Sequence, residues 1–352
     1  MTELILAGAA TSALTHFAMN GLSNIIAHET GCSVASYWHD STTPTARIVA
    51  DGIDENQIAA AVRQHAGRCA CDGSWLQAEA DIGGKMTAVF SPRIKTPADD
   101  AEWKALQQIR HRHIDELLRA GEVLDLAMIG GLGEPAYWRF DGKDRRPDHG
   151  ASRWEMKARN KGEEFVGHRL RPMARVVADR SPAAILDGLT GVRMCDELGS
   201  ANPSASQTAT GFTRPGPTDC AMAWCALWGV TNFPLAHHVS KISTTPAAFP
   251  STVLHTRFMV LPVITTPVAA ARVRSILVSG ALRVQAEHQC GIASADPFVV
   301  DSARRWLRSR GVVATVVFPV EKAGSDNAPQ RFVLEGAIET LRTGESADLL
   351  AG

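Results

Sequence analysis

The stretch that most constrains the fold is CAMAWCALWGV, residues 220–230, in which every residue is apolar. Thr218 and Asp219 stand just before it, and these residue types cap helices by accepting hydrogen bonds from the first free N–H groups. A helix that is apolar on all sides has no face to turn toward water. The sequence therefore predicts a capped helix that is buried within the fold.

The bulk composition indicates an ordinary globular protein. Of the 352 residues, 45% are hydrophobic and 21% are charged, and the formal net charge is -1. The seven cysteines are odd in number and irregular in spacing, which favours a reducing cytoplasm over a disulfide framework. No signal peptide is recognisable at the N-terminus, and no apolar run reaches membrane-spanning length. These features predict a cytoplasmic protein with no membrane partner.

Hydrophobic periodicity predicts an α+β fold with mixed sheets, packed helices and long polar loops. Expected strands lie at 3–7, 32–38, 46–52, 86–92, 252–264, 281–288, 312–320 and 331–336, and expected helices at 12–29, 98–119, 168–178, 267–280 and 301–311, with two further helices that begin at Asp54 and Ser181. The C-terminal alternation of strands and helices is βαβ-like, and ferredoxin-like pieces are one form that it could take.

Changes in composition predict a division of the chain. The expected parts are an N-terminal α+β region at 1–140, a middle region at 141–250 with a basic loop, a polar loop and the buried helix, a C-terminal βαβ-like region at 251–342, and a flexible tail at 343–352.

The middle region concentrates positive charge. Between Arg139 and Arg180 there are 12 Lys and Arg residues against 7 Asp and Glu, although the whole chain is almost neutral. Arginine forks bind phosphate in a bidentate manner, and an indole such as that of Trp154 can stack on a base. The alternative is a solvated loop with its own ion pairs. A second polar loop at 198–217 carries Gln207 and Arg214 and is longer than most loops without a role.

Other patterns argue against a metal, a cofactor or catalysis. His65, Cys69 and Cys71 lack the spacing and the fourth ligand of a zinc site. The glycines at 130–135 match neither nucleotide-binding fingerprint and predict a turn. His237 and His238 could titrate near neutral pH, but no nucleophile or carboxylate pair accompanies them. We therefore expect no metal, no cofactor and no catalytic residue.

Three segments together resemble a known family. They are THFAMNGLSNIIAHETG at 15–31, SRWEMKARNKGEEFVGHRLRPMARVV at 152–177 and GFTRPGPTDCAMAWCALWGVTNFPL at 211–235. They resemble the large-subunit-like proteins of type I CRISPR interference complexes of the I-U subtype, also called I-G. The resemblance covers about a quarter of the chain, and the chain is shorter than most large subunits.

The resemblance implies a non-catalytic subunit of an RNA-guided surveillance complex, Cascade. Its implied partners are guide RNA, target DNA next to the protospacer, other Cascade subunits and a helicase-nuclease recruited after target binding. It implies that the basic segment positions phosphates through Arg145, Arg146, Arg153, Lys157, Arg159, Lys161, Arg169 and Arg171, and that Trp154, Asn160 and Gln207 lie nearer the bases, with Arg214 in the second loop.

Two alternatives remain open at this point. One is a guide-RNA processing or backbone subunit, in which His237 or His238 would act as a general base on an RNA hydroxyl. The other is a structural adaptor whose cationic segment docks an acidic protein.

Overall fold

The computed structural model describes residues 1–39, 43–135, 140–141, 144–145, 147–155, 165–199, 210–239, 241–325 and 328–342. Its helices and small sheets form an α+β fold, as the sequence predicts. All strand pairings between its named strands are antiparallel.

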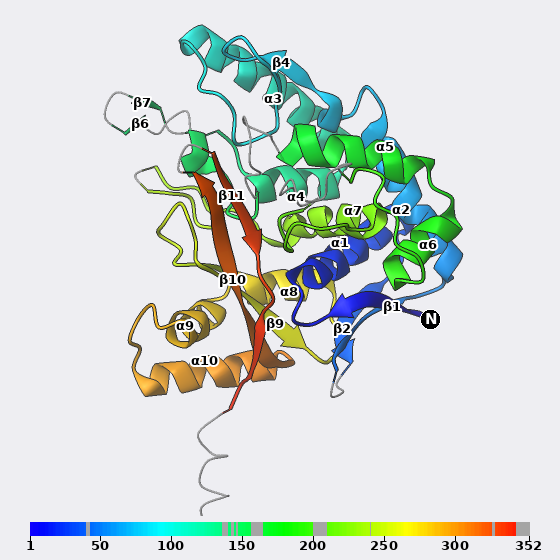
Figure 1. Cartoon of the computed structure of the whole chain (residues 1–352), viewed down its shortest axis with the longest axis vertical. Coiled ribbons are helices and arrows are strands. Elements are labelled where there is room, and N and C mark those ends of the chain that lie inside the picture. Colours follow the sequence, from blue (N-terminus) through cyan, green and yellow to red (C-terminus); the bar gives the residue numbers. More distant parts are fainter. Residues whose placement is uncertain are drawn as a thin grey trace, which may run out of the picture.

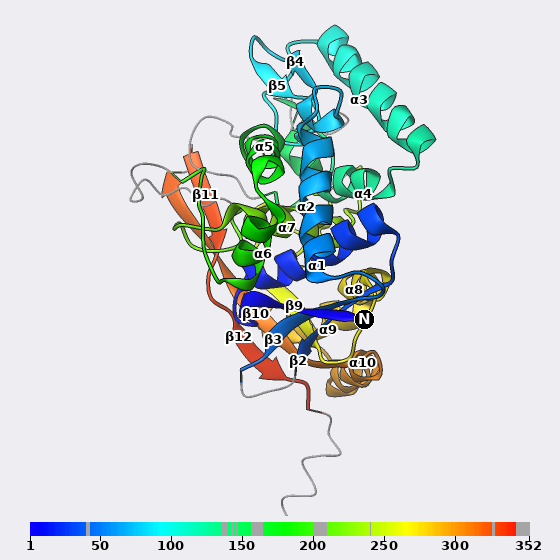
Figure 2. The same cartoon turned by 90° about the vertical axis from the view of Figure 1, so that its right-hand side faces the viewer.

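The N-terminal half supplies a three-stranded sheet, the small β4-β5 sheet and several of the central helices (Figure 2). β1 (Thr2–Ala9), β2 (Val34–His39) and β3 (Thr45–Ala50) form a sheet in the order β1-β3-β2. The helices and short strands that follow are α1 (Ala13–Thr30), α2 (Glu55–Ala70), η1 (Trp75–Gln77), β4 (Glu79–Asp81), β5 (Met86–Ala88), α3 (Asp100–Ala120) and α4 (Val123–Leu132).

The middle of the chain contains the helix that the sequence predicts to be buried. Its elements are β6 (Phe140–Asp141), β7 (Asp144–Arg145), η2 (Pro147–Gly150), the π-helix η3 (Val166–Leu170), α5 (Arg171–Asp179), α6 (Pro182–Thr190), α7 (Cys220–Trp228) and η4 (Gly229–Asn232). Every residue of α7 is buried, and the Asp219 carboxylate accepts hydrogen bonds from the N–H groups of Ala221 and Met222. The prediction of a capped, buried helix is confirmed.

Two glycines allow α1 and α7 to cross at the centre of the molecule (Figure 1). A Cβ atom at Gly21 would lie 1.9 Å from the carbonyl oxygen of Cys225, and one at Gly229 would lie 2.2 Å from that of Phe17. The two backbones therefore touch, and only glycine fits at these positions.

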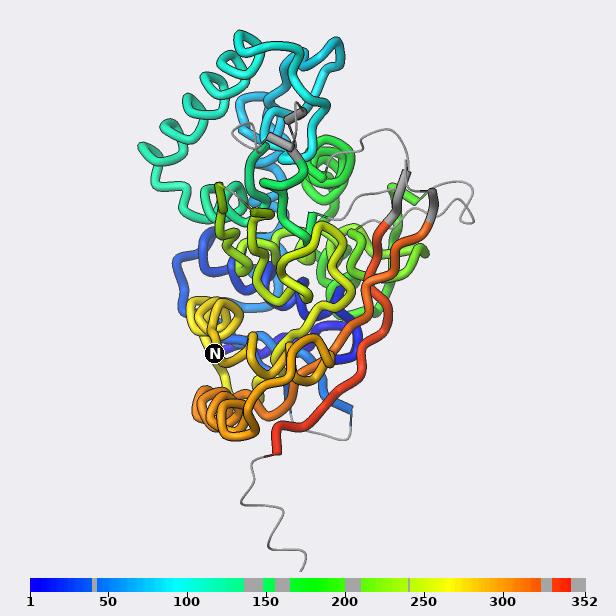
Figure 3. Tube along the Cα trace, turned by 90° about the vertical axis from the view of Figure 1, so that its left-hand side faces the viewer, coloured from blue at the N-terminus to red at the C-terminus, as the bar shows by residue number. Residues whose placement is uncertain are grey.

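The C-terminal part is built on one long strand. Its elements are β8 (Ala248–Phe249), β9 (Phe258–Ile264), α8 (Ala270–Leu277), α9 (Gly280–Gln289), α10 (Pro297–Ser309), β10 (Val312–Ser325), β11 (Ala328–Val333) and β12 (Ala337–Thr340). β10 pairs with β9 and β12 along its first half and with β11 along its second half. The helices lie beside these strands (Figure 3).

The expectation of a strand at 281–288 is wrong, because this stretch belongs to α9. The buried side chains of Leu282, Gln285 and Ala286 have helical spacing, and the Ser279 hydroxyl accepts a hydrogen bond from the Leu282 N–H at 3.1 Å. β9 and β10 are consequently joined through three helices and pair antiparallel, which differs from the parallel crossover of a βαβ unit.

The turn expected at 130–135 begins later than predicted. Gly130 and Gly131 still belong to α4, and the chain leaves the helix at Gly133, whose φ is 88°. The buried hydrophobic residues form one core cluster. Its members range from Leu4 to Leu341 and come from all three of the regions that composition suggests.

Candidate nucleic-acid interface

The structure describes only part of the predicted interface. Of its residues, Arg146, Lys157, Arg159, Asn160, Lys161 and Gln207 lie outside the described residues, and Arg145 is described only as a backbone position in β7. The side chains that the structure describes are those of Arg153, Trp154, Arg169, Arg171 and Arg214.

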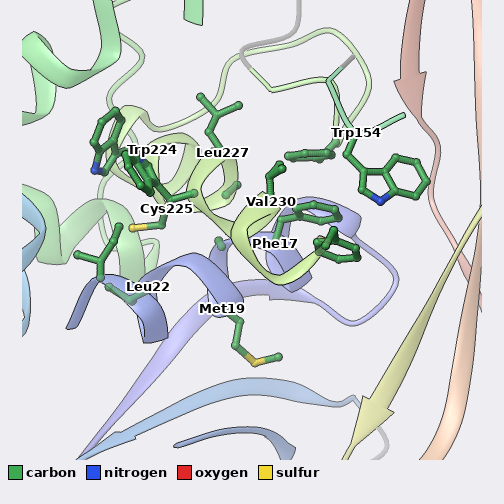
Figure 4. Close-up of a cluster of buried hydrophobic side chains, with 14 of the residues drawn as sticks. Phe17, Met19, Leu22, Trp154, Trp224, Cys225, Leu227 and Val230 are labelled. Carbon is green, nitrogen blue, oxygen red and sulfur yellow. The ribbon is translucent and has the colours of Figure 1, made fainter. Parts of the chain in front are cut away.

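Trp154 is a core residue, so its expected stacking on a base is corrected. Its side chain is 0% exposed, and its Nε1 donates to the carbonyl oxygen of Pro246 at 2.9 Å. The indole lies edge-on to Phe17 and Phe233 in the aromatic cluster beside α1 (Figure 4). A ring that is fully buried in the core is not accessible for stacking on a base.

Arg153 is also buried, at 2% exposed, which corrects its expected contact with a surface phosphate. Its guanidinium donates to the carbonyl oxygens of Leu254 at 3.0 Å and Ala151 at 2.6 Å, and its backbone N–H donates to the Thr245 hydroxyl at 2.9 Å. These bonds hold the chain in place just before the basic residues at 157–161.

The next cations of the segment also have protein partners. Arg169 is buried and donates to the carbonyl oxygen of Thr210 at 2.9 Å, which corrects its expected phosphate contact. Arg171 is half-buried, forms an ion pair with Glu79 and donates to the carbonyl oxygen of Leu76. Arg214 is exposed, so it alone among these side chains has the accessibility that the prediction requires.

Three arginines from distant parts of the chain come together around Glu155. We call Arg93, Arg153 and Arg331, together with Asp148 and Glu155, the buried arginine cluster. Arg93 forms ion pairs with Glu155 and, at 3.3 Å, with Asp148. The carbonyl oxygen of Leu254 accepts hydrogen bonds from both Arg153 and Arg331. Three guanidinium groups thus lie near two carboxylates, and Arg93 forms ion pairs with both of them.

The pKa values around the cluster reflect this excess of positive charge. Burial, followed by repulsion from neighbouring arginines, lowers the pKa of Arg153 and that of Arg331 to about 9. Burial raises the pKa of Glu155, and Arg93 opposes this rise. Burial and then Arg331, Lys322, Arg93 and Arg153 lower the pKa of nearby His255 to about 4. A proton on His255 is disfavoured partly because the surroundings are already positive.

The cluster also fixes both ends of the stretch at 156–164. Glu155 immediately precedes that stretch, Phe165 immediately follows it, and the Phe165 N–H donates to the Glu155 carboxylate at 3.3 Å. Lys157, Arg159 and Lys161 are therefore carried by a segment whose two ends meet at one buried point.

Sequence reasoning missed Arg93, Arg331 and His255. Each is a single residue in its own segment, and no spacing links them to Arg153. They come together only because β11 and the loops before α3 and β9 converge, which local periodicity does not report.

The metal ligands weighed from the sequence do not form a site. His65 is buried against Trp228, with ring centroids 4.2 Å apart, whereas Cys71 is exposed. Among the described residues, ligand atoms come together instead at His28, Glu122 and Asp125. Arg68 forms ion pairs with Glu122 at 3.1 Å and with Asp125 at 2.8 Å. Its guanidinium therefore already offsets the charge of these two carboxylates.

The histidines considered for acid–base chemistry have structural contacts. Nδ1 of His237 lies 3.1 Å from the Ser243 hydroxyl, and Nε2 of His238 lies 2.9 Å from that of Thr244. Ser243 is 1% exposed, so its hydroxyl is closed to a substrate. Burial lowers the pKa of His237, which keeps it neutral near pH 7.

No family model and no curated protein sequence matches the chain. Across the described part of the chain, we find no helix with the length and apolar character needed to span a bilayer.

Proposed function

We propose that the chain is a non-catalytic nucleic-acid-binding subunit of a type I CRISPR surveillance complex, which contacts guide RNA, the target DNA beside the protospacer, or both. Its partners in the proposal are other Cascade subunits and a recruited helicase-nuclease, in the cytoplasm. The class of complex comes from the resemblance of the three segments, and the mode of binding comes from the charges described above.

The observation that carries the proposal is the excess of positive charge in the buried arginine cluster, where the segment at 156–164 begins and ends. Low-dielectric surroundings strengthen the field of such charges, and clustered cations of this kind attract phosphate. Arg153 then acts by anchoring and by its field. In the proposal, direct phosphate contact falls to Lys157, Arg159 and Lys161. Arg214 adds a further phosphate contact, and Asn160 and Gln207 lie nearer the bases.

The first test removes the three segment cations together in K157A/R159A/K161A. Each lost phosphate contact lowers the salt slope by about 0.7 for a single strand, so we expect weaker binding and a slope reduced by about 2. The probes are single-stranded RNA and duplex DNA of mixed sequence, followed by fluorescence anisotropy over a salt series. K104A/R112A/R119A removes three exposed cations from α3 and is the matched control. Equal affinity and slope in the two triple variants would contradict the proposal.

The assembly is tested by purifying the tagged protein from its native host and sequencing bound RNA. Uniform guide RNAs with companion subunits are the expected result, and a single protein without nucleic acid would contradict it. Incubation with precursor RNA addresses the processing alternative, since the proposed subunit leaves that RNA uncut. Salt-sensitive binding to acidic protein alone would favour the adaptor.

A further inference from the structure

Helix α10 has an outer face that the proposed interface does not use. Its inner stripe, Val300, Ala303 and Leu307, is buried against the rest of the protein. On the outside, Phe298 is 72% and Val299 is 46% exposed. Phe298 is the most exposed aromatic side chain among the described residues. α10 lies at the edge of the molecule beside α9 (Figures 1 and 3).

The second half of α10 and the C-cap residue after it are strongly cationic. The sequence RRWLRSR at 304–310 contains four arginines in seven residues. Tertiary structure adds a fifth, because Arg308 donates to the carbonyl oxygen of Leu341 at 2.8 Å and Arg304 to that of Arg342 at 3.5 Å. The exposed Arg342 therefore lies against the same end of the helix.

Within α10 the arginines outnumber the acidic residues, and Arg310, just past the end of the helix, lies over an aromatic ring. Asp301 is the only acidic residue within α10, and it pairs with Arg305 at 3.1 Å, although the Arg305 side chain stays 54% exposed. The guanidinium of Arg310 lies 5.1 Å from the centroid of the Trp306 ring. A stacked guanidinium has lost part of its freedom already, so less entropy is lost when it binds a phosphate.

We propose that the outer face of α10, together with Arg310 just past its end, binds single-stranded nucleic acid. Arg305 and Arg308 on the helix and Arg310 at its end would contact phosphates, and the exposed ring of Phe298 would stack on a base. Phe298 and Arg310 are about 18 Å apart along the helix axis, at 1.5 Å per residue, which is room for several phosphates.

Single-stranded nucleic acid fits this face better than an acidic protein does. A protein partner would need acidic groups and flat apolar groups that alternate at the right spacing. Every nucleotide of a single strand carries both a phosphate and a ring face. The inference rests on the proposed function only for the class of ligand, because α10 is separate in sequence from the segment at 156–164.

The experiment measures binding of fluorescein-labelled 20-nucleotide oligo-dT and oligo-U to the full chain. In R305Q/R310Q we expect about ten-fold weaker binding and a salt slope lowered by about 1.4. R112Q/R119Q, with both changes at exposed positions of α3, is the matched control and should bind like the wild type. Equal affinity in the two double variants would overturn the inference.

A second variant isolates the ring of Phe298. F298L keeps an apolar side chain at this exposed position but removes the stacking surface, and we expect about five-fold weaker binding. Unchanged binding of F298L would overturn the stacking contact. Equal capture of poly-glutamate, weakened to the same degree in R305Q/R310Q, would overturn the choice of nucleic acid and point to an acidic protein.

The two sites fail in distinguishable ways. If K157A/R159A/K161A abolishes binding and R305Q/R310Q does not weaken it, the inference about α10 is wrong and the proposed interface stands. The reverse result supports α10 and contradicts the proposed interface. A wild-type protein that binds no oligonucleotide overturns both.

Discussion

At the scale of single residues, the type of side chain does not reveal its role in this protein. Arg153 and Trp154 are residue types that often contact nucleic acid, yet both are buried and donate hydrogen bonds to backbone carbonyl groups. Gly21 lies in a predicted helix and in a segment that resembles a family, but neither observation shows that it stands at a close approach of two helices. A residue's surroundings, more than its identity, set its contribution.

The close approach at Gly21 can be tested with one methyl group. In Gly21→Ala the new Cβ meets the backbone of α7, which cannot move away without shifting a buried helix. We expect the free energy of unfolding to fall by about 3 kcal/mol or more, measured by urea denaturation.

Gly130→Ala is the control, because Gly130 lies in α4 and a Cβ there meets nothing within 4 Å. Alanine stabilises a helix relative to glycine, so we expect a gain of about 0.5–1 kcal/mol. A similar loss in both variants would show that the contact between the two helices is looser than described.

At the scale of elements, a helix cap can act locally or can also belong to a tertiary hydrogen-bond network. Asp219 caps α7 and also accepts two hydrogen bonds from Arg180, at 3.1 and 3.0 Å, and one from the Cys195 N–H at 3.0 Å. Ser181 caps the neighbouring helix α6 through one bond to the Ala184 N–H. The same kind of sequence signal therefore marks a simple cap in one helix and a buried network in the next.

The two caps should differ in their contribution to stability. Asp219→Ala removes the cap and leaves buried Arg180 with one acidic partner fewer, so we expect a loss of about 3–5 kcal/mol. Ser181→Ala should cost about 1 kcal/mol. Chemical denaturation monitored by circular dichroism gives both values, and equal losses would contradict the network at Asp219.

At the scale of the whole molecule, buried histidines make stability sensitive to acid. Burial lowers the pKa of His16 from 6.5 to about 4 and the pKa of His65 well below 6.5. Below pH 6.5 the unfolded chain binds protons that the folded chain does not, so the stability present at higher pH is lost as the pH falls from 6.5 toward these folded values.

His65→Phe should reduce this sensitivity, because phenylalanine keeps a ring beside Trp228 and cannot take up a proton. Between pH 6.5 and 5 the wild type should lose up to about 2 kcal/mol more than the variant. His111→Gln, at an exposed position of α3, should follow the wild type. The measurement is the free energy of unfolding at a series of pH values, and parallel curves for wild type and His65→Phe would contradict the assignment.

The sequence by itself determined much of the local structure. The α+β class, the strand and helix near the N-terminus, the long helix α3 and the capped, buried α7 all follow from periodicity and cap residues, which act within a few positions of the chain. The prediction of a strand at 281–288 was wrong. Its short run of mixed apolar and polar residues is compatible with both strand and helix periodicity, and the burial of Leu282 and Ala286 on one side favours the helix.

Only the tertiary structure decided which charges are buried. Arg93, Arg153 and Arg331 come from three separate segments, and their meeting depends on how the loops and β11 converge. A run of cations in a sequence reports net charge but not which side chains face water, because burial is set by neighbours far along the chain. For the same reason, the cationic face of α10 gained Arg342 only when the chain folded.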